Sequence, residues 1–119
     1  MAQFAVLIYE PGDPDWSTLD TEDKQQTMKQ YAAFGQSVAA VLRGGAALYP
    51  TTTATTLRQP GSEIVTSDGP YAETKEVLTG FYLLECADLD EALRHARRVP
   101  AVHNGAIEVR PVIEFGAGD

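Results

Sequence analysis

The residues best suited to chemistry lie in one short stretch, from Asp68 to Glu76, which reads DGPYAETKE. An aspartate in a turn usually accepts a hydrogen bond from the backbone N–H two residues later. Here that position is Pro70, which has no N–H. The Asp68 carboxylate therefore either caps a short helical turn through the N–H of Tyr71 or stays free as a general base or ligand anchor. We predict that Asp68 is the catalytic residue.

Charged and aromatic side chains from two segments could bind a ligand together with Asp68. Glu108 and Arg110 alternate along the last expected strand, so both lie on the side opposite the core. Arg110 either holds a carboxylate or phosphate in a bidentate manner or pairs with Glu108 or Glu114. We predict that Arg110, Glu108, Tyr71 and Lys75 bind ligand.

The pattern predicts neither a metal nor a cofactor. Glu73 and Glu76 share one face of a helical turn, which suits a hard cation or a solvated polar turn, and their spacing matches no calcium loop. His95 and His103 lack metal-ligand spacing to another ligand, so we interpret both as surface residues. Cys86 reads as a small buried hydrophobe. The chain contains no phosphate-cradling glycine loop, Ser-His-Asp signature or zinc motif.

Hydrophobic periodicity predicts the elements that would position these residues. Apolar runs predict strands over residues 4–9, 46–49, 78–86 and 107–115. Residues 51–58 and 63–66 predict an added hairpin, because β-branched threonines favour extended structure. A short helical turn is expected from Pro70 through Glu76, since proline is tolerated at the first helical position.

Two helices are expected between these strands. The first spans residues 21–43, with Asp20 or Thr21 as N-cap and a buried stripe from Met28 to Leu42. Residues 44–45, a Gly-Gly pair, would supply its left-handed exit. The second helix begins with a capping-box-like pair, Asp88 and Glu91, buries residues 89, 92, 93, 96 and 99, and ends at residue 100, a proline.

The element order is β-α-β, a hairpin, then β-α-β. It predicts an α+β fold of the ferredoxin-like split βαβ type with an inserted β-hairpin, in a single domain over residues 1–119. Both helices would cover one sheet face and leave Ala5, Leu7 and Tyr9 exposed on the other. An exposed apolar sheet face usually marks an interface. We therefore predict a homodimer that packs sheet to sheet around a cleft.

Composition excludes several classes of protein. The chain has 119 residues, 44% hydrophobic and 22% charged, which is typical of a soluble globular protein. Nine basic against 17 acidic residues give a formal charge of −8, which disfavours nucleic acid and anionic membrane surfaces as partners. The first apolar run stops at Tyr9, far short of the ~20 residues that span a bilayer. The absence of signal-peptide features and the single cysteine predict a cytoplasmic protein.

Four segments resemble the YCII-related family, and more narrowly its DGPF branch: DGPYAETKE (68–76), LTGFY (78–82), DLDEA (88–92) and GAIEVRPV (105–112). Tyr71 occupies a position where phenylalanine is usual in that branch. The resemblance extends more loosely to residues 44–48 and the threonine-rich hairpin. It implies a ferredoxin-like fold assembled as a dimeric α+β barrel.

The same resemblance implies a site in which a histidine is paired with an aspartate. Asp68 fits the aspartate, whereas the first expected helix has no histidine and carries Met28 or Tyr31 in that region. The resemblance also links the DGPF branch to extracytoplasmic-function sigma factors.

Three functions are compatible with these residues. The first is a small-molecule-binding homodimer that transfers a proton between its sheets, with Asp68 as base and Arg110 as anion clamp. The alternative is a non-enzymatic regulatory or binding module associated with an extracytoplasmic-function sigma factor, which its acidic surface would suit if the partner is basic. In the third, Asp68, Tyr71 and Arg110 only hold the dimer together.

Overall fold

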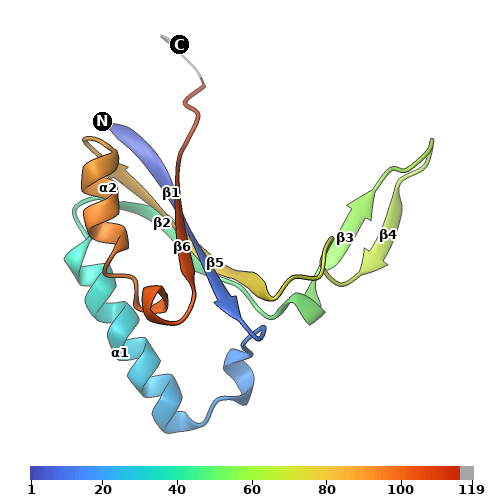
Figure 1. Cartoon of the computed structure of the whole chain (residues 1–119), viewed down its shortest axis with the longest axis horizontal. Helices are drawn as coiled ribbons and strands as arrows, with labels where there is room; N and C mark the ends of the chain where they lie inside the picture. The colour runs from blue at the N-terminus through green and yellow to red at the C-terminus, as the bar shows by residue number, and fades with distance from the viewer. Residues whose placement is uncertain (116–119) are drawn as a thin grey trace.

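Two antiparallel sheets hold all the strands of the computed structural model, which describes residues 1–115 (Figure 1). The main sheet has four strands in the order β2-β5-β1-β6, and β3 and β4 form a separate two-stranded sheet. The strands are β1 (Ala2–Pro11), β2 (Leu42–Ala47), β3 (Thr55–Arg58), β4 (Val65–Asp68), β5 (Glu76–Cys86) and β6 (Ala106–Pro111). This order is consistent with the expected ferredoxin-like α+β fold.

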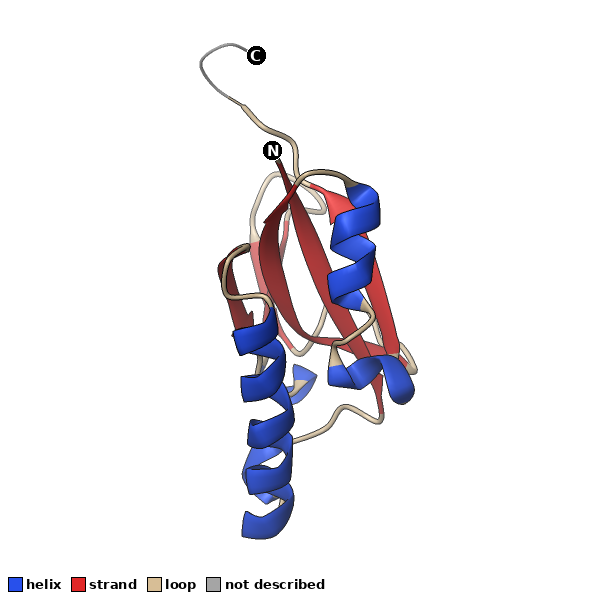
Figure 2. Cartoon of the chain, turned by 90° about the vertical axis from the view of Figure 1, so that its left-hand side faces the viewer, coloured by secondary structure: helices blue, strands red, loops and turns tan. Residues whose placement is uncertain are grey.

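Two helices, α1 (Thr21–Ser37) and α2 (Leu89–Ala96), lie over one face of the main sheet (Figure 2). Short 3₁₀ turns connect the other elements: η1 (Trp16–Thr18), η2 (Thr51–Thr53) and η3 (Pro100–His103). Both expected N-caps are confirmed. The carboxylate of Asp20 accepts from the N–H of Asp23 at 2.8 Å, and that of Asp88 accepts from the N–H of Glu91 at 2.9 Å. Among residues 1–115, no helix is long and apolar enough to cross a membrane.

The core lies between the helices and the main sheet, and the alternation of β1 shows which face it occupies. Phe4, Val6 and Ile8 are buried, while the residues between them are only half-buried, as expected. The remaining core residues come from both helices, their flanks and β5: Phe34, Val38, Leu84, Cys86, Ala92, Ala96, Val99 and Ala101. Leu89, expected in the buried stripe of α2, is instead exposed.

The first helix is shorter than predicted and ends at Ser37 instead of residue 43. The N–H of Val38 bonds back to Phe34, and a tight turn follows. Leu42 then pairs with Leu84 of β5, so non-local sheet pairing overrides the helical periodicity of this segment. Met28, expected in the buried stripe, is 60% exposed.

Gly44 and Gly45 lie within β2 and do not form the predicted helix exit. A Cβ atom on Gly45 would lie 2.6 Å from the carbonyl oxygen of Phe81 in the neighbouring strand. Glycine is therefore required here because two backbones approach closely.

Two other boundaries also differ from the sequence prediction. The expected helical turn at residues 70–76 is wrong: these residues form bends and an extended approach to β5. The guanidinium of Arg58 donates to the carbonyl oxygen of Tyr71 at 3.0 Å, and so holds this segment in a non-helical path. The last strand ends at Pro111, short of residue 115. The N–H of Val112 still donates to the carbonyl oxygen of Gln3 at 2.9 Å, and β1 begins at Ala2, so little of the partner strand remains for pairing. The predicted edge position of this strand is confirmed, whereas the expected fraying of residues 116–119 lies outside the described residues.

The predicted hairpin is confirmed as β3 and β4, although residues 51–53 form a 3₁₀ turn before it. We call residues 55–68 the arm, because this hairpin projects away from the main sheet (Figure 1). None of the arm residues is buried. The radius of gyration is 16.5 Å, whereas a compact domain of this length would have about 13.5 Å. The chain is therefore extended for its size.

Candidate functional site

The face of the main sheet opposite the helices, which we call the open face, carries the expected set of half-buried apolar residues. Register places Leu7 opposite Phe81 of β5 and Ala5 opposite Leu83. These side chains remain partly accessible, because no element of residues 1–115 covers them. The open face is thus an apolar surface with polar groups at its β6 edge.

A phenol, a carboxylate and a guanidinium lie along that edge. On β6, Glu108 is opposite Leu7 and Arg110 is opposite Ala5, so both point to the open face as predicted. The hydroxyl of Tyr9 donates to Glu108 Oε1 at 3.3 Å. Gly105 permits this geometry, because a Cβ atom there would lie 2.0 Å from the carbonyl oxygen of Tyr9.

Tyr9 is held in its protonated form at this position. Burial raises the pKa of Tyr9 above its usual value, and the negative charge and hydrogen bond of Glu108 raise that pKa further, while Arg110 opposes the shift. The phenol therefore acts as a hydrogen-bond donor that orients the Glu108 carboxylate.

Tyr71 also reaches this group, although it comes from the segment after the arm. Its side chain is close enough to contribute electrostatically to the raised pKa of Tyr9. The guanidinium carbon of Arg58 lies 5.8 Å from the centre of the Tyr71 ring, in a cation–π contact. We call Tyr9, Tyr71, Glu108 and Arg110 the open-face cluster.

The other two predicted site residues do not join this cluster within one chain. Asp68 is the last residue of β4, lies opposite Thr55, and is exposed. Over residues 1–115, the Asp68 carboxylate accepts no hydrogen bond, so the helix-cap alternative is wrong. Lys75 is exposed in the loop before β5 and has no ion pair with any described residue.

The expected alternative for Arg110, an ion pair with Glu108 or Glu114, is not formed among residues 1–115 of one chain, and such a pair between subunits stays a prediction. Within the described part of the chain, the ion pairs join Arg43 to Glu85 and His95 to Glu91. Glu108 instead accepts the hydrogen bond of Tyr9. The Arg110 guanidinium is exposed and available to an anion.

A second polar group lies on the helix side of the main sheet. A register shift in the β1–β5 pairing follows Ile8, and the hydroxyl of Thr79 donates to Glu10 Oε1 at 2.7 Å. Tyr31 of α1 lies near this carboxylate. Burial, the charge of Glu10 and Tyr82 together raise the pKa of Tyr31 to about 12, against a smaller opposing effect of the Ala101 backbone.

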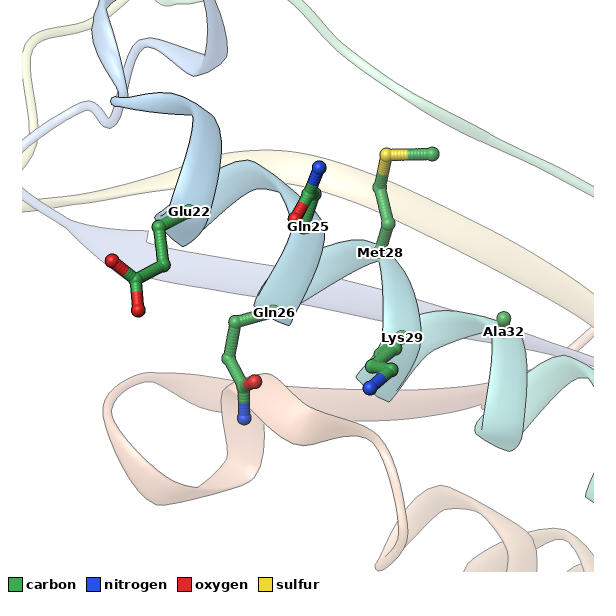
Figure 3. Close-up of a pocket in the computed structure, with 6 residues that line it drawn as sticks. All are labelled: Glu22, Gln25, Gln26, Met28, Lys29 and Ala32. Carbon is green, nitrogen blue, oxygen red and sulfur yellow. The ribbon is translucent and has the colours of Figure 1, made fainter.

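A depression on the surface of α1 does not form a convincing site. It has a volume of about 480 Å³ and lies along the outside of α1 (Figure 3). Figure 3 shows that its side chains leave a single helix in different directions and do not converge on one point. They are Glu22, Gln25, Gln26, Met28, Lys29 and Ala32.

The metal-ligating and nucleophilic residue types noted in the sequence have these positions in the structure. In residues 1–115, no group of three or more His, Cys, Asp or Glu side chains is placed to hold a metal ion. His95 was interpreted as a surface residue but is largely enclosed, with 16% of its side chain exposed. His103 is exposed as expected. Cys86 is buried, and burial raises the pKa of its thiol, so the predicted role as a small hydrophobe is confirmed.

Comparison with known proteins shows the family. The model of the YCII-related domain matches residues 3–116, so the chain belongs to the YCII-related family. A relative, the "Uncharacterized protein R00369" of Rhizobium meliloti (strain 1021), is 40% identical over 122 residues. That alignment covers 98% of this chain and 96% of the relative.

Among solved structures, the chain is similar to 5-chloro-2-hydroxyhydroquinone dehydrochlorinase (TftG) from Burkholderia phenoliruptrix AC1100, in complex with 2,5-dihydroxybenzoquinone. The TM-score is 0.48 and the sequence identity is 16%. The similarity covers 96% of this chain and 95% of that one.

Sequence reasoning missed two members of this region. Tyr9 was interpreted as a residue that packs in the core or at the interface, or that lines the mouth of the cleft. Its hydrogen bond to Glu108 was not predicted, although the polar hydroxyl at the end of that strand was a usable signal. Arg58 gave no signal, because its contact with Tyr71 depends on how the arm folds back at its base.

Proposed function

We propose that this chain, a member of the DGPF branch of its family, acts as a homodimer that binds a small anionic molecule between two facing main sheets. One observation carries the proposal: a phenol, a carboxylate and an unpaired guanidinium meet at the edge of an apolar open face. Small-molecule sites commonly combine an apolar lining with a few convergent polar groups. The single free cysteine also supports a cytoplasmic location.

Each member of the open-face cluster has a distinct role in this proposal. Arg110 binds the carboxylate or phosphate of the ligand with two parallel hydrogen bonds. Glu108, oriented by the Tyr9 hydroxyl, accepts a hydrogen bond from a ligand hydroxyl or amine. Tyr71 packs its ring against the ligand, and Lys75 adds a second positive charge from the loop before β5.

Asp68 is the proposed base. Its carboxylate is exposed and unbonded within residues 1–115, so it can take a proton from the bound molecule. The bond broken is the ligand's X–H bond, the bond formed is O–H on Asp68, and the negative charge left on the ligand is stabilised by Arg110.

Ligand binding tests the role of Arg110. Benzoate and inorganic phosphate serve as probes, and the shift of the thermal unfolding midpoint with probe concentration measures binding. We expect benzoate, phosphate or both to raise the midpoint of the wild type and to have no such effect on Arg110→Gln. Arg97→Gln is the matched control, because it removes an exposed arginine at the end of α2. Equal shifts in wild type and Arg110→Gln, or none for either probe in the wild type, would contradict the proposal.

Dimerisation is tested separately by sedimentation velocity. We expect a dimer at micromolar concentration for the wild type and a monomer for Leu7→Glu, which places a charge on the open face. Thr52→Glu, on the exposed η2 turn, is the control. A wild-type protein that remains monomeric under these conditions would remove the enclosed site.

The regulatory alternative depends on the net charge of −8, which suits a basic partner. It predicts co-purification with an extracytoplasmic-function sigma factor that persists in Asp68→Asn and weakens at high salt. Ligand binding lost with Arg110, and no sigma factor bound, would instead favour the small-molecule function.

A further inference from the structure

The arm has two faces with different surroundings. One face makes hydrogen bonds to the segment that follows the arm in the same chain. Cross-strand pairing places Thr56, Arg58, Val65 and Ser67 on that face. The Thr56 hydroxyl donates to the carbonyl oxygen of Gly69 at 2.7 Å, and Arg58 bonds to Tyr71 at 3.0 Å. These contacts connect the arm to the open-face cluster of the same chain.

Within residues 1–115, the other face of the arm makes no such hydrogen bonds. Thr55 lies opposite Asp68 and Leu57 opposite Thr66, so these four residues share one side, which we call the free face. Leu57 is 66% exposed, and Ile64 at the arm's tip is 67% exposed. The free face therefore presents an apolar side chain and a carboxylate together.

The arm is held at its base, so the direction in which it projects is defined. The Asp13 carboxylate accepts hydrogen bonds from both the N–H and the hydroxyl of Thr51, the first at 2.9 Å. The N–H of Gly69 donates to Ala54 at 2.7 Å across the start of the hairpin. An isolated two-stranded hairpin is marginally stable in water, so an arm of this kind needs a packing partner.

Exposed apolar groups concentrate in the same region. Among residues 1–115, fifteen large hydrophobic side chains stay exposed, and seven of them lie between positions 48 and 78. These are Leu48, Tyr49, Leu57, Ile64, Val65, Tyr71 and Leu78. Together with the radius of gyration of 16.5 Å, this concentration indicates that the arm side of the molecule is covered in the assembled protein.

We propose that the free face of the arm packs against a second copy of this chain and places Asp68 beside Arg110 of the partner subunit. The charges are complementary: neither Asp68 nor Arg110 has an ion pair within the described residues of its own chain. The open face beside Arg110 offers apolar side chains for Leu57 to pack against. The inference rests on the proposed homodimer and explains how Asp68, remote from the cluster within one chain, becomes part of the site.

A charge exchange between subunits tests this contact. Asp68→Arg and Arg110→Asp each place like charges at both symmetric contacts of a homodimer, so each should raise the dimer dissociation constant at least about tenfold at low salt. An equimolar mixture of the two variants should dimerise nearly as well as the wild type, because each contact in the mixed dimer again joins opposite charges. Sedimentation equilibrium measures all four dissociation constants, that of the wild type included, and circular dichroism checks that each variant is folded.

Glu63→Arg is the matched control, since it makes the same charge change on the arm outside the paired strands. It should leave the constant within about threefold of the wild type. Recovery in the doubly substituted chain but not in the mixture would show a contact within one chain and overturn the proposal. Dimers whose constants are unchanged by either single variant would also overturn it, while leaving the homodimer intact. A monomeric wild type would instead contradict the proposed function itself.

Discussion

The main sheet and the arm are both antiparallel, yet within residues 1–115 only the main sheet has a hydrophobic core. Phe4, Val6 and Ile8 alternate into a layer covered by two helices, whereas no residue of the arm is buried. Burial of apolar side chains is the main favourable contribution to folding. The main sheet can therefore fold on its own contacts, while within residues 1–115 the arm is held by its own strand pairing and by contacts at its base.

The proposed functional groups are likewise divided between the main sheet and the arm. Tyr9 and Glu108 are fixed by strands of the main sheet, and their hydrogen bond joins residues 99 positions apart. Asp68 sits on the arm, and within residues 1–115 its carboxylate accepts no hydrogen bond. In the proposal, strands of the main sheet thus position the ligand-binding half of the site, and assembly positions the proton-accepting half.

The largest expected difference between the two regions is the cost of removing a leucine. Leu84 is fully buried in β5, so Leu84→Ala should lower the free energy of unfolding by about 2–5 kcal/mol. Leu57→Ala, on the arm, should change it by less than about 0.5 kcal/mol when the monomer is measured. Urea denaturation at low protein concentration measures both. Equal losses would show that the arm belongs to the same cooperative unit as the main sheet.

A methyl group added to a glycine should likewise affect stability and binding more in the main sheet than in the arm. On Gly105 the new Cβ would lie 2.0 Å from the carbonyl oxygen of Tyr9, so β1 and β6 must move apart. We expect Gly105→Ala to cost about 1–3 kcal/mol and to weaken benzoate or phosphate binding, because Tyr9 and Glu108 lose their register.

Gly61→Ala, in the turn of the arm, is the control, since nothing lies within 4 Å of its added Cβ. It should leave both stability and binding unchanged. A Gly105→Ala variant with the stability and binding of the wild type would show that the approach of Tyr9 to Gly105 is not needed for the site.

The difference between local and non-local structure also explains which sequence predictions were confirmed. The alternation of β1, the caps at Asp20 and Asp88 and the hairpin depend on residues close in sequence, and all three are present. The extension of α1 to residue 43 is wrong because pairing with β5 competes for Leu42. No local pattern carries that information.

The same distinction between local and non-local structure applies to the candidate site. Alternation alone places Glu108 and Arg110 on one face, and the structure confirms this. The bond from Tyr9 to Glu108 requires the register of two strands at opposite ends of the chain, which periodicity does not specify. The position of Asp68 relative to Arg110 requires an assembly, so it stays a prediction.

A smaller difference in global stability is expected between the loss of two hydrogen bonds of similar length, one at the start of α2 and one in the arm. Asp88→Ala removes the N-cap of α2, which the carboxylate makes with Glu91 at 2.9 Å, and should cost about 1 kcal/mol of global stability. Thr56→Val removes the hydroxyl that binds Gly69 at 2.7 Å and should change global stability little. Amide hydrogen exchange should instead show faster exchange confined to the arm in Thr56→Val. Exchange that rises throughout the main sheet in that variant would contradict the prediction that the effect is confined to the arm.

The last expected difference is a pH dependence that belongs to the main sheet. Burial, followed by Glu10 and Tyr82, raises the pKa of Tyr31 to about 12 in the folded protein, above the value of 10.0 for a free side chain. Below pH 10 both states keep the phenol protonated, so its contribution to stability is complete. Between pH 10 and 12 the unfolded chain releases that proton more readily, and stability falls as pH rises. Tyr31→Phe lacks this loss, so its urea midpoint should decline less than that of the wild type from pH 9 to pH 11.5. Parallel curves for wild type and Tyr31→Phe would contradict the assignment of the titration to the helix side of the sheet.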